Sequence, residues 1–260
     1  MKNIIYIILF LLSLLGCSKD AIDNSDTGLY GLNNYIREFD FSDSTQLIDL
    51  PAFGEDHSYI ENEQLKAPIK VNKHKGLGRK FWFENNGGEP NEAEIEFTIW
   101  LADNFQKNGV NDEVGKFPGF EGIYDRNAGW GGRKVTTQNS WSVRIVHAGE
   151  NNEGKIPIGL YVYHPGMIDK YGTTINPNFL LNKEQYYSVK LYIRMNEINK
   201  ENGILILSVD ENEIYNSNSW RFRNENSVHI KSVCLDAYVG GPTPSLFDTY
   251  ILIDNLKIKW

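Results

Sequence analysis

The sequence is poor in cysteine and has no excess of positive charge. Only Cys17 and Cys234 occur among 260 residues, so no disulfide framework is expected to hold the fold together. The net charge of −8 argues against wholesale binding of nucleic acid, which needs a basic surface. The five histidines lack the spacing typical of zinc ligands, and neither a metal nor a cofactor is expected.

Stretches with the 3.6-residue period of amphipathic helices are also scarce. The chain is instead rich in aromatic residues, with 14 Tyr, 13 Phe and 6 Trp, which favours strands. Residues 94–100 alternate polar and apolar side chains, as a half-buried strand does. Further strands are predicted at 64–71, 79–83, 141–146, 159–164, 186–195, 204–209, 228–239 and 250–260. This pattern predicts an all-β fold, a β-jelly roll sandwich of two antiparallel sheets with a concave ligand-binding face.

The N-terminus resembles an export signal. Lys2 precedes an apolar run over residues 4–15, and the run ends in Leu-Leu-Gly-Cys. This predicts a lipoprotein signal peptide over residues 1–17 with a lipidated Cys17. Residues 18–45 are expected to form a flexible tether, and residues 46–260 one domain. A plain secretory signal with an incidental cysteine is the alternative.

These features predict a place in the bacterial cell envelope, on the outer membrane and facing either the periplasm or the surface. The chain is expected to be lipid-anchored and monomeric, and to touch the membrane only through the lipid. Cys234 lies between Val233 and Leu235, so it is expected to be a small core residue rather than a nucleophile.

Polar side chains on two predicted strands are candidates for a functional site. Ser142 and Arg144 alternate with apolar residues, so they share the face opposite the core. By the same alternation Tyr161 and Tyr163 project together from a second strand. A segment rich in glycine and proline holds Lys116. If the two strands are neighbours in one sheet, these five side chains form a single patch.

A glycine-rich loop over residues 129–134 carries further candidates. It places Trp130, Arg133 and Lys134 close together in the sequence, and His164 directly follows the second tyrosine. Trp130 is suited to stacking on a sugar ring. These four residues are expected to bind substrate beside the patch. For His164 an ordinary surface histidine at a strand end is the favoured alternative, and an additional acid or base is the less favoured one.

The patch is suited to β-elimination on a polymer of uronic acids. It has no carboxylate pair for glycoside hydrolysis and no Ser-His-Asp arrangement. Elimination removes the C5 proton beside the sugar carboxylate, so Lys116 and Arg144 would stabilise the developing enolate, with Ser142 orienting it. Nearby cations would favour a phenolate. Tyr161 and Tyr163 would then supply the base and the acid, in an order that the sequence leaves open.

The same residues carry a resemblance to a known family. The segments Gly115-Lys116-Phe117-Pro118-Gly119-Phe120-Glu121-Gly122, Trp141-Ser142-Val143-Arg144 and Leu160-Tyr161-Val162-Tyr163-His164 resemble the signature of polysaccharide lyase family 14, which contains alginate and glucuronan lyases on a β-jelly roll. The resemblance extends from about residue 81 to the C-terminus. It implies that Lys116, Ser142, Arg144, Tyr161 and Tyr163 support catalysis. Ile123 departs from the family pattern, and the loops 126–139 and 149–158 are particular to this chain.

The sequence therefore predicts a polysaccharide lyase that cleaves a uronic-acid-containing polysaccharide, such as alginate or glucuronan, without a metal ion. Two alternatives remain open. One is a glycan-binding surface lipoprotein that uses the same scaffold without catalysis, and the other is a structural envelope protein. The identity of the uronan and the choice between endo and exo action are not specified by the sequence.

Overall fold

The computed structural model describes residues 35–109, 114–135 and 140–260. The predicted signal peptide with its lipidated Cys17, and the predicted tether up to residue 34, lie outside these ranges. No helix within them has both the length and the apolar character needed to cross a bilayer.

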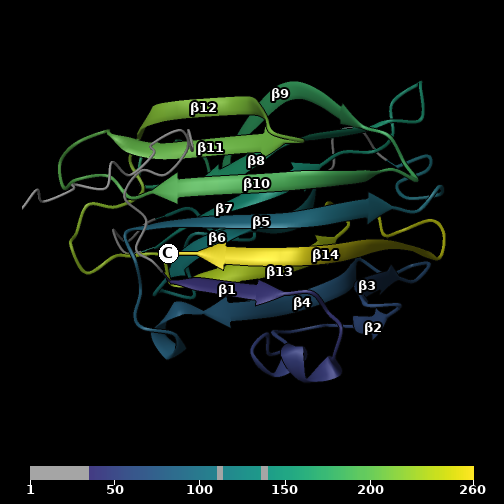
Figure 1. Ribbon diagram of the computed structural model, residues 1–260. Coiled ribbons are helices and arrows are strands. Elements are labelled where there is room, and N and C mark those ends of the chain that lie inside the picture. The colour runs from purple at the N-terminus through teal and green to yellow at the C-terminus, as the bar shows by residue number, and fades with distance from the viewer. Residues whose placement is uncertain (1–34, 110–113, 136–139) are drawn as a thin grey trace, which may run out of the picture. The chain divides into compact units, whose positions relative to one another are not determined.

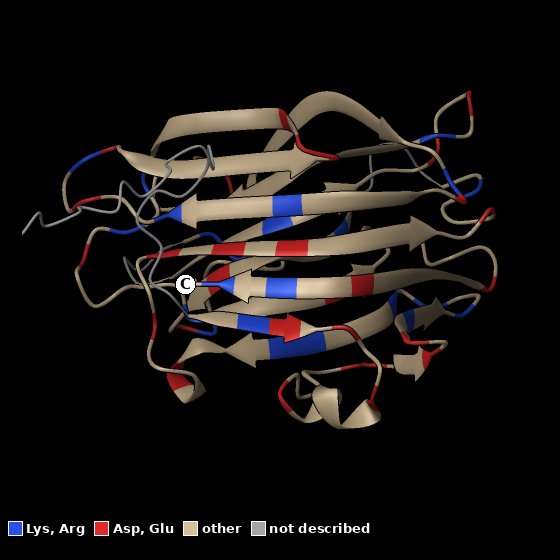
Figure 2. Cartoon of the chain, viewed as in Figure 1, with Lys and Arg blue, Asp and Glu red and all other residues tan. Residues whose placement is uncertain are grey.

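An eight-stranded antiparallel sheet faces the viewer in Figure 1. Its order is β12 (Asn212–Trp220), β11 (Gly203–Val209), β10 (Tyr186–Arg194), β5 (Glu92–Leu101), β14 (Thr249–Lys259), β3 (Gln64–Ile69) and β2 (Tyr59–Glu61), and β1 (Ile36–Phe39) pairs with the second half of β14. Acidic residues of β5 lie beside basic residues of β10 and β14 (Figure 2). Two of these pairs are Lys259 with Glu94 at 2.9 Å and Lys190 with Glu96 at 3.8 Å.

A six-stranded antiparallel sheet lies behind the first (Figure 1). Its order is β4 (Lys75–Trp82), β13 (Ser232–Tyr238), β6 (Gly115–Ile123), β7 (Ser140–His147), β8 (Ile156–Tyr163) and β9 (Thr173–Leu181). Two short 3₁₀ helices, η1 (Ser44–Ile48) and η2 (Phe83–Asn85), complete the described elements.

The hydrophobic core lies between the sheets. Ile95, Phe97 and Ile99 of β5 point inward and are buried, whereas the residues between them are less buried. Leu160 and Val162 of β8 are buried from the opposite sheet. Burial of alternate residues from both sheets forms the sandwich, so the predicted all-β jelly roll is confirmed.

The folded domain begins before residue 46, inside the segment predicted to be a tether. β1 pairs with β14 over residues 36–39, and Phe39 and Phe41 are buried in the core. The segment is polar on average, which obscured these two aromatic anchors. The prediction of a tether is therefore wrong for residues 36–45, and residues 18–34 lie outside the described ranges.

Five strands were not predicted from the sequence, and they differ from the others in composition or position. β9 and β12 are edge strands with many exposed polar residues, as edges often are. β1 and β2 are short. β6 contains Pro118, which cannot donate to a ladder, and the pairing with β7 shifts register between Lys116 and Gly119. A bulge of this kind accommodates proline within a sheet.

Candidate active site

A cleft of about 780 Å³ lies over the outer face of the six-stranded sheet. Residues of β6, β7, β8, β9 and β13 line it, together with glycines 131, 132, 172, 240 and 241 from the surrounding loops. Three predicted site residues are on its wall, namely Lys116, Tyr161 and Tyr163. The other predicted residues are outside the lining set: Ser142, Arg144, Trp130, Arg133, Lys134 and His164.

Lys116 is the cation on the wall of this cleft. It lies at the start of the register shift between Lys116 and Gly119, and its Nζ lies 5.5 Å from the centre of the Tyr238 ring. Burial, and then the nearby Arg144 guanidinium, lower the pKa of Lys116. Within the described residues no carboxylate lies at salt-bridge distance from its Nζ, whereas Lys80 is paired with Glu121. Lys116 is therefore a partly desolvated cation that is available to an anionic ligand.

Tyr161 and Tyr163 are neighbours on β8, with ring centres 5.3 Å apart and planes at 87°. The hydroxyl of Tyr161 donates to that of Tyr163 at 3.5 Å. Each oxygen also accepts a backbone N–H, from Gly172 to Tyr161 at 2.9 Å and from Gly132 to Tyr163 at 2.8 Å. These contacts fix both phenols at the cleft wall, as predicted from strand alternation.

The protonation of Tyr161 differs from the sequence-based expectation. Burial first, and the hydrogen bond with Tyr163 second, raise the pKa of Tyr161 above its ordinary value. Tyr161 is therefore a neutral phenol at physiological pH, and nearby cations do not make it a phenolate. A phenol that keeps its proton is suited to act as a general acid.

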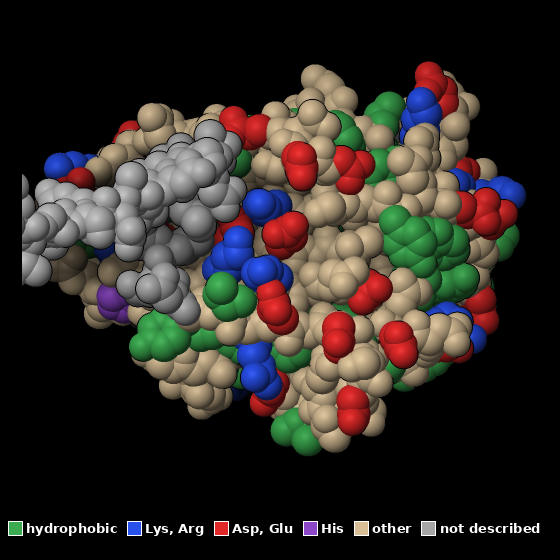
Figure 3. All heavy atoms as spheres, viewed as in Figure 1, with side chains coloured by type: hydrophobic (Ala, Val, Ile, Leu, Met, Phe, Trp, Pro, Cys, Tyr) green, Lys and Arg blue, Asp and Glu red, His purple; other side chains and the backbone are tan. Residues whose placement is uncertain are grey.

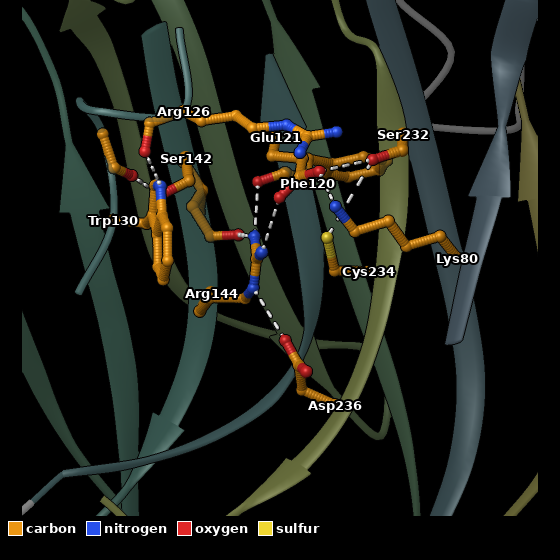
Figure 4. Close-up of polar contacts among 12 residues, drawn as sticks. Lys80, Phe120, Glu121, Arg126, Trp130, Ser142, Arg144, Ser232, Cys234 and Asp236 are labelled. Atoms are coloured by element: carbon orange, nitrogen blue, oxygen red, sulfur yellow. Dashed lines mark hydrogen bonds and ion pairs between the residues drawn. The ribbon is translucent and has the colours of Figure 1, made fainter. Parts of the chain in front are cut away.

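Arg144 lies on the predicted face of its strand, but its guanidinium binds other protein groups and is not left open for a substrate carboxylate. Its Nε donates to Asp236 at 3.1 Å and its Nη2 to Glu121 at 3.0 Å. Its Nη1 donates to the Phe120 carbonyl at 2.8 Å. All three guanidinium nitrogens are thus bound within the protein (Figure 4). Arg144 belongs to a buried ion network beneath the cleft and is not poised to bind a sugar carboxylate.

Glu121 is the centre of this network (Figure 4). It pairs with Lys80 and Arg144 and accepts a hydrogen bond from Ser232 at 2.9 Å. Burial alone would raise its pKa, but Arg144 and Lys80 outweigh burial and lower the pKa of Glu121 to about 2. Glu121 therefore remains ionised, as a buried carboxylate with two cationic partners does.

Cys234 lies next to these charges and is not part of the main hydrophobic cluster. It is buried, as predicted, and burial raises the pKa of its thiol. A buried, protonated thiol is inert as a nucleophile.

Ser142 supports the glycine-rich loop from below. Its Oγ is buried and donates to the Gly129 carbonyl at 2.7 Å. Further along this loop, Gly132 has a φ of +75°, a left-handed conformation that glycine adopts without strain. The N–H of Gly132 is the group that meets Tyr163. Ser142 therefore acts on the site through the loop that contacts the tyrosine.

The remaining predicted residues lie around the cleft. The Arg133 guanidinium lies 3.9 Å from the ring centre of Trp130, which is 42% exposed. Lys134 donates to the Ile168 carbonyl at 2.7 Å and so joins two loops. His164 bonds Thr173 at 2.9 Å, and burial followed by Arg221 lowers its pKa.

His147 and Tyr238 also line the cleft and were not predicted as site residues. His147 is 1% exposed, and its Nε2 lies 3.2 Å from the Tyr238 carbonyl oxygen. Burial lowers the pKa of His147 to about 4, so the ring is neutral at physiological pH. The sequence signal was weak because His147 ends an apolar strand and its contacts come from distant residues.

Comparison with solved structures supports the fold. Aly36B, an alginate lyase solved as a double mutant with an alginate tetrasaccharide, superposes with a TM-score of 0.68 at 19% identity, over 87% of this chain and 93% of the other. The marine PL-14 alginate lyase from Aplysia kurodai gives 0.61 at 16% identity, over 86% and 90%. The endo-β-1,4-glucuronan lyase of the fungus Trichoderma reesei gives 0.51 at 11% identity, over 89% and 92%.

No curated protein matches the sequence significantly. The family model described as polysaccharide lyase 14 matches residues 60–249. This range includes every cleft residue discussed above and most of the chain. The protein therefore belongs to the polysaccharide lyase 14 family and is a polysaccharide lyase.

Proposed function

We propose that this enzyme cleaves a uronic-acid-containing polysaccharide, of the alginate or glucuronan type, by β-elimination without a metal ion. The observation that carries the proposal is the convergence of Lys116, Tyr161 and Tyr163 on one cleft wall. The similar structures include lyases for alginate and for glucuronan, which supports this substrate class.

Lys116 is proposed to bind the carboxylate of the sugar whose C5 proton is removed. Its ammonium group is partly desolvated, and no carboxylate of the described residues lies at salt-bridge distance from it. A substrate carboxylate would complete the missing ion pair. As the proton leaves, negative charge spreads onto the carboxylate, and a cation already in place stabilises that enolate.

Tyr163 is proposed as the base and Tyr161 as the acid. The Tyr163 oxygen accepts hydrogen bonds from Gly132 and from Tyr161, so of the two hydroxyls it is the acceptor and Tyr161 is the donor. Tyr163 as a phenolate takes the C5 proton, the C4–O bond breaks, and Tyr161 gives its proton to the departing oxygen. The product carries a C4–C5 double bond.

The contact between the two hydroxyls also restores the site. After one turnover Tyr163 holds the proton and Tyr161 is a phenolate. A transfer along the Oη–Oη contact of 3.5 Å returns the proton to Tyr161, where burial favours the neutral form. No other proton donor is needed for the next cycle.

The glycine-rich loop is proposed to bind more distant sugar units. Trp130 and Arg133 present an aromatic ring and a cation beside Gly131 and Gly132, which line the cleft. Lys134 and His164 are proposed to hold this end of the cleft in shape through their bonds to Ile168 and Thr173. Ser142 and Arg144 are proposed to position the floor.

The test is the ultraviolet absorbance of the unsaturated product. Purified protein is incubated with polymannuronate, polyguluronate and polyglucuronate, with and without EDTA. We expect absorbance to rise on at least one polymer and to be unchanged by EDTA. Lys116→Ala, Tyr161→Phe and Tyr163→Phe should each abolish most of the rise, and the matched control Tyr35→Phe should not.

The competing function is glycan capture without cleavage. It predicts retention of a uronan by wild-type protein with no unsaturated product on any of the polymers. That result would contradict the proposed lyase activity. Membership of a lyase family favours cleavage.

We also propose that the enzyme is anchored to the bacterial cell envelope through a lipid on Cys17. The support is the apolar run followed by Leu-Leu-Gly-Cys. Mass spectrometry of the mature N-terminus should find a diacylglyceryl group on Cys17, and Cys17→Ala should release the protein from the membrane fraction. A mature chain cleaved elsewhere and free of lipid would contradict the anchor.

A further inference from the structure

The outer face of the eight-stranded sheet carries a strip of aromatic side chains on the side opposite the cleft. Hydrophobic side chains gather on this face over the end of β5 and the start of β14 (Figure 3). Cross-strand pairing places Tyr59, Lys66, Leu252, Trp100 and Tyr186 in one row across β2, β3, β14, β5 and β10. Tyr250 stands beside the row on β14. We call these six residues the aromatic strip.

The rings of the strip are packed against one another. Trp100 stacks on Tyr250 with centres 5.5 Å apart and planes at 29°. Lys66 Nζ lies 4.5 Å from the centre of the Tyr250 ring and 5.9 Å from that of Tyr59. These contacts hold the side chains in place, so a ligand would meet a pre-organised surface at little entropic cost.

Tyr186 lies along the sheet. Its hydroxyl and the Gln64 amide are 3.2 Å apart, although β5 and β14 separate their strands. A tyrosine that reaches across two strands presents one ring face to solvent, and Tyr186 is 49% exposed. Tyr59, at the other end of the row, is 43% exposed.

A row of hydrogen-bonding side chains runs beside the strip. Asp254, Thr98 and Ser188 are cross-strand neighbours, and Gln64 bonds Asp254 at 3.4 Å. The surface thus offers apolar ring faces next to hydroxyl, amide and carboxylate groups. Sugars have apolar C–H faces and hydroxyl edges, and tyrosine and tryptophan match this amphipathic character.

The charged residues on and beside the aromatic strip determine which kind of sugar it can bind. Lys66 is neutralised by Glu61 at 2.6 Å, and within the described residues Asp254 has no Lys or Arg at salt-bridge distance. The surface therefore carries a local negative charge, which repels a polyuronate and tolerates a neutral polymer. The row spans four strand spacings, about 19 Å, which suits a chain of several sugar units.

We propose that the aromatic strip is a second glycan-binding site, specific for a neutral polysaccharide. The cleft would act on an anionic polymer while the opposite sheet holds a neutral one. Such an arrangement would keep the enzyme on a matrix that contains both. The proposal concerns a different face and a different ligand, so it does not depend on the chemistry of the cleft.

The test measures binding of neutral hexasaccharides of β-glucan, β-mannan and β-xylan by titration calorimetry. We expect wild-type protein to bind at least one of them. Tyr186→Ala and Tyr59→Ala, both at half-exposed positions, and Trp100→Ala should weaken binding about tenfold, as expected for the loss of one stacking ring. Tyr35→Ala removes an exposed tyrosine outside the strip and should leave affinity unchanged.

Lyase rates on a soluble polyuronate report whether each variant is folded, and they should match the wild type. Absence of binding to all three hexasaccharides would overturn the proposal, as would binding that survives Tyr186→Ala and Tyr59→Ala. The assignment to a neutral ligand would be overturned if a polyuronate bound the Lys116→Ala protein and this binding disappeared in the double variant that also carries Tyr186→Ala.

Discussion

The outer faces of the two sheets arrange their charges in opposite ways. Beneath the cleft, Glu121 and Arg144 are buried and pair with each other, and they also pair with Lys80 of β4 and Asp236 of β13. On the eight-stranded sheet, the pairs Lys190–Glu96 and Lys257–Glu38 join neighbouring strands in contact with solvent. Buried pairs are strongly coupled and fix geometry, whereas exposed pairs are screened and contribute little. The ion network therefore shapes the cleft, and Lys116, which has no salt bridge among the described residues, is a cleft cation available to a ligand.

The largest expected effect is on the acid of the proposed reaction. Tyr161→Phe removes only the hydroxyl that donates the proton, so kcat should fall by about 10²–10⁴ while KM changes little. Steady-state kinetics on the preferred polyuronate measures both, with Tyr35→Phe as the control. A loss confined to KM would show that Tyr161 binds substrate without transferring a proton.

The second-largest expected effect is on the free energy of unfolding, when Glu121 is removed from the centre of the buried ion network. Glu121→Ala leaves Arg144 and Lys80 without their shared carboxylate, and we expect a loss of about 3–5 kcal/mol in the free energy of unfolding. Glu38→Ala, which breaks the exposed pair with Lys257, should cost less than about 1 kcal/mol. Urea unfolding of both variants measures the contrast. Equal losses would contradict the distinction between the two faces.

The pH dependence of stability should report His147. Burial lowers its pKa from 6.5 to about 4 in the folded state, so the unfolded chain binds this proton more readily. The stabilisation is present above pH 6.5 and is lost as pH falls toward 4, by roughly 3 kcal/mol in total. Urea midpoints across this window should decline in the wild type and decline less in His147→Gln. The exposed control His57→Gln should follow the wild type.

The smallest effect is expected at Ser142. Ser142→Ala removes one hydrogen bond to the Gly129 carbonyl, worth about 1 kcal/mol, and the side chain does not line the cleft. Unfolding should be slightly easier and kcat/KM should fall less than tenfold. A loss as large as that of Tyr161→Phe would place Ser142 in contact with the reacting sugar.

Strand alternation was enough to predict the cleft-facing tyrosines, because Tyr161 and Tyr163 share one strand and one face. It also predicted the face of Arg144. It did not predict what Arg144 binds, because Glu121 and Asp236 come from other strands and their pairing depends on sheet order. The aromatic strip was missed for the same reason. Tyr59 and Tyr186 stand at the two ends of one row, and that row exists only once five strands have assembled into a sheet.

The central claim is that Lys116 offers the positive charge that makes the C5 proton of an anionic sugar removable. The direct measurement compares kcat/KM for a polyuronate and its methyl ester in the wild type and in Lys116→Met. An ester carries no charge to neutralise, so the account predicts that Lys116→Met loses about 10²–10³ on the free polymer and far less on the ester. Equal losses on both polymers would contradict it.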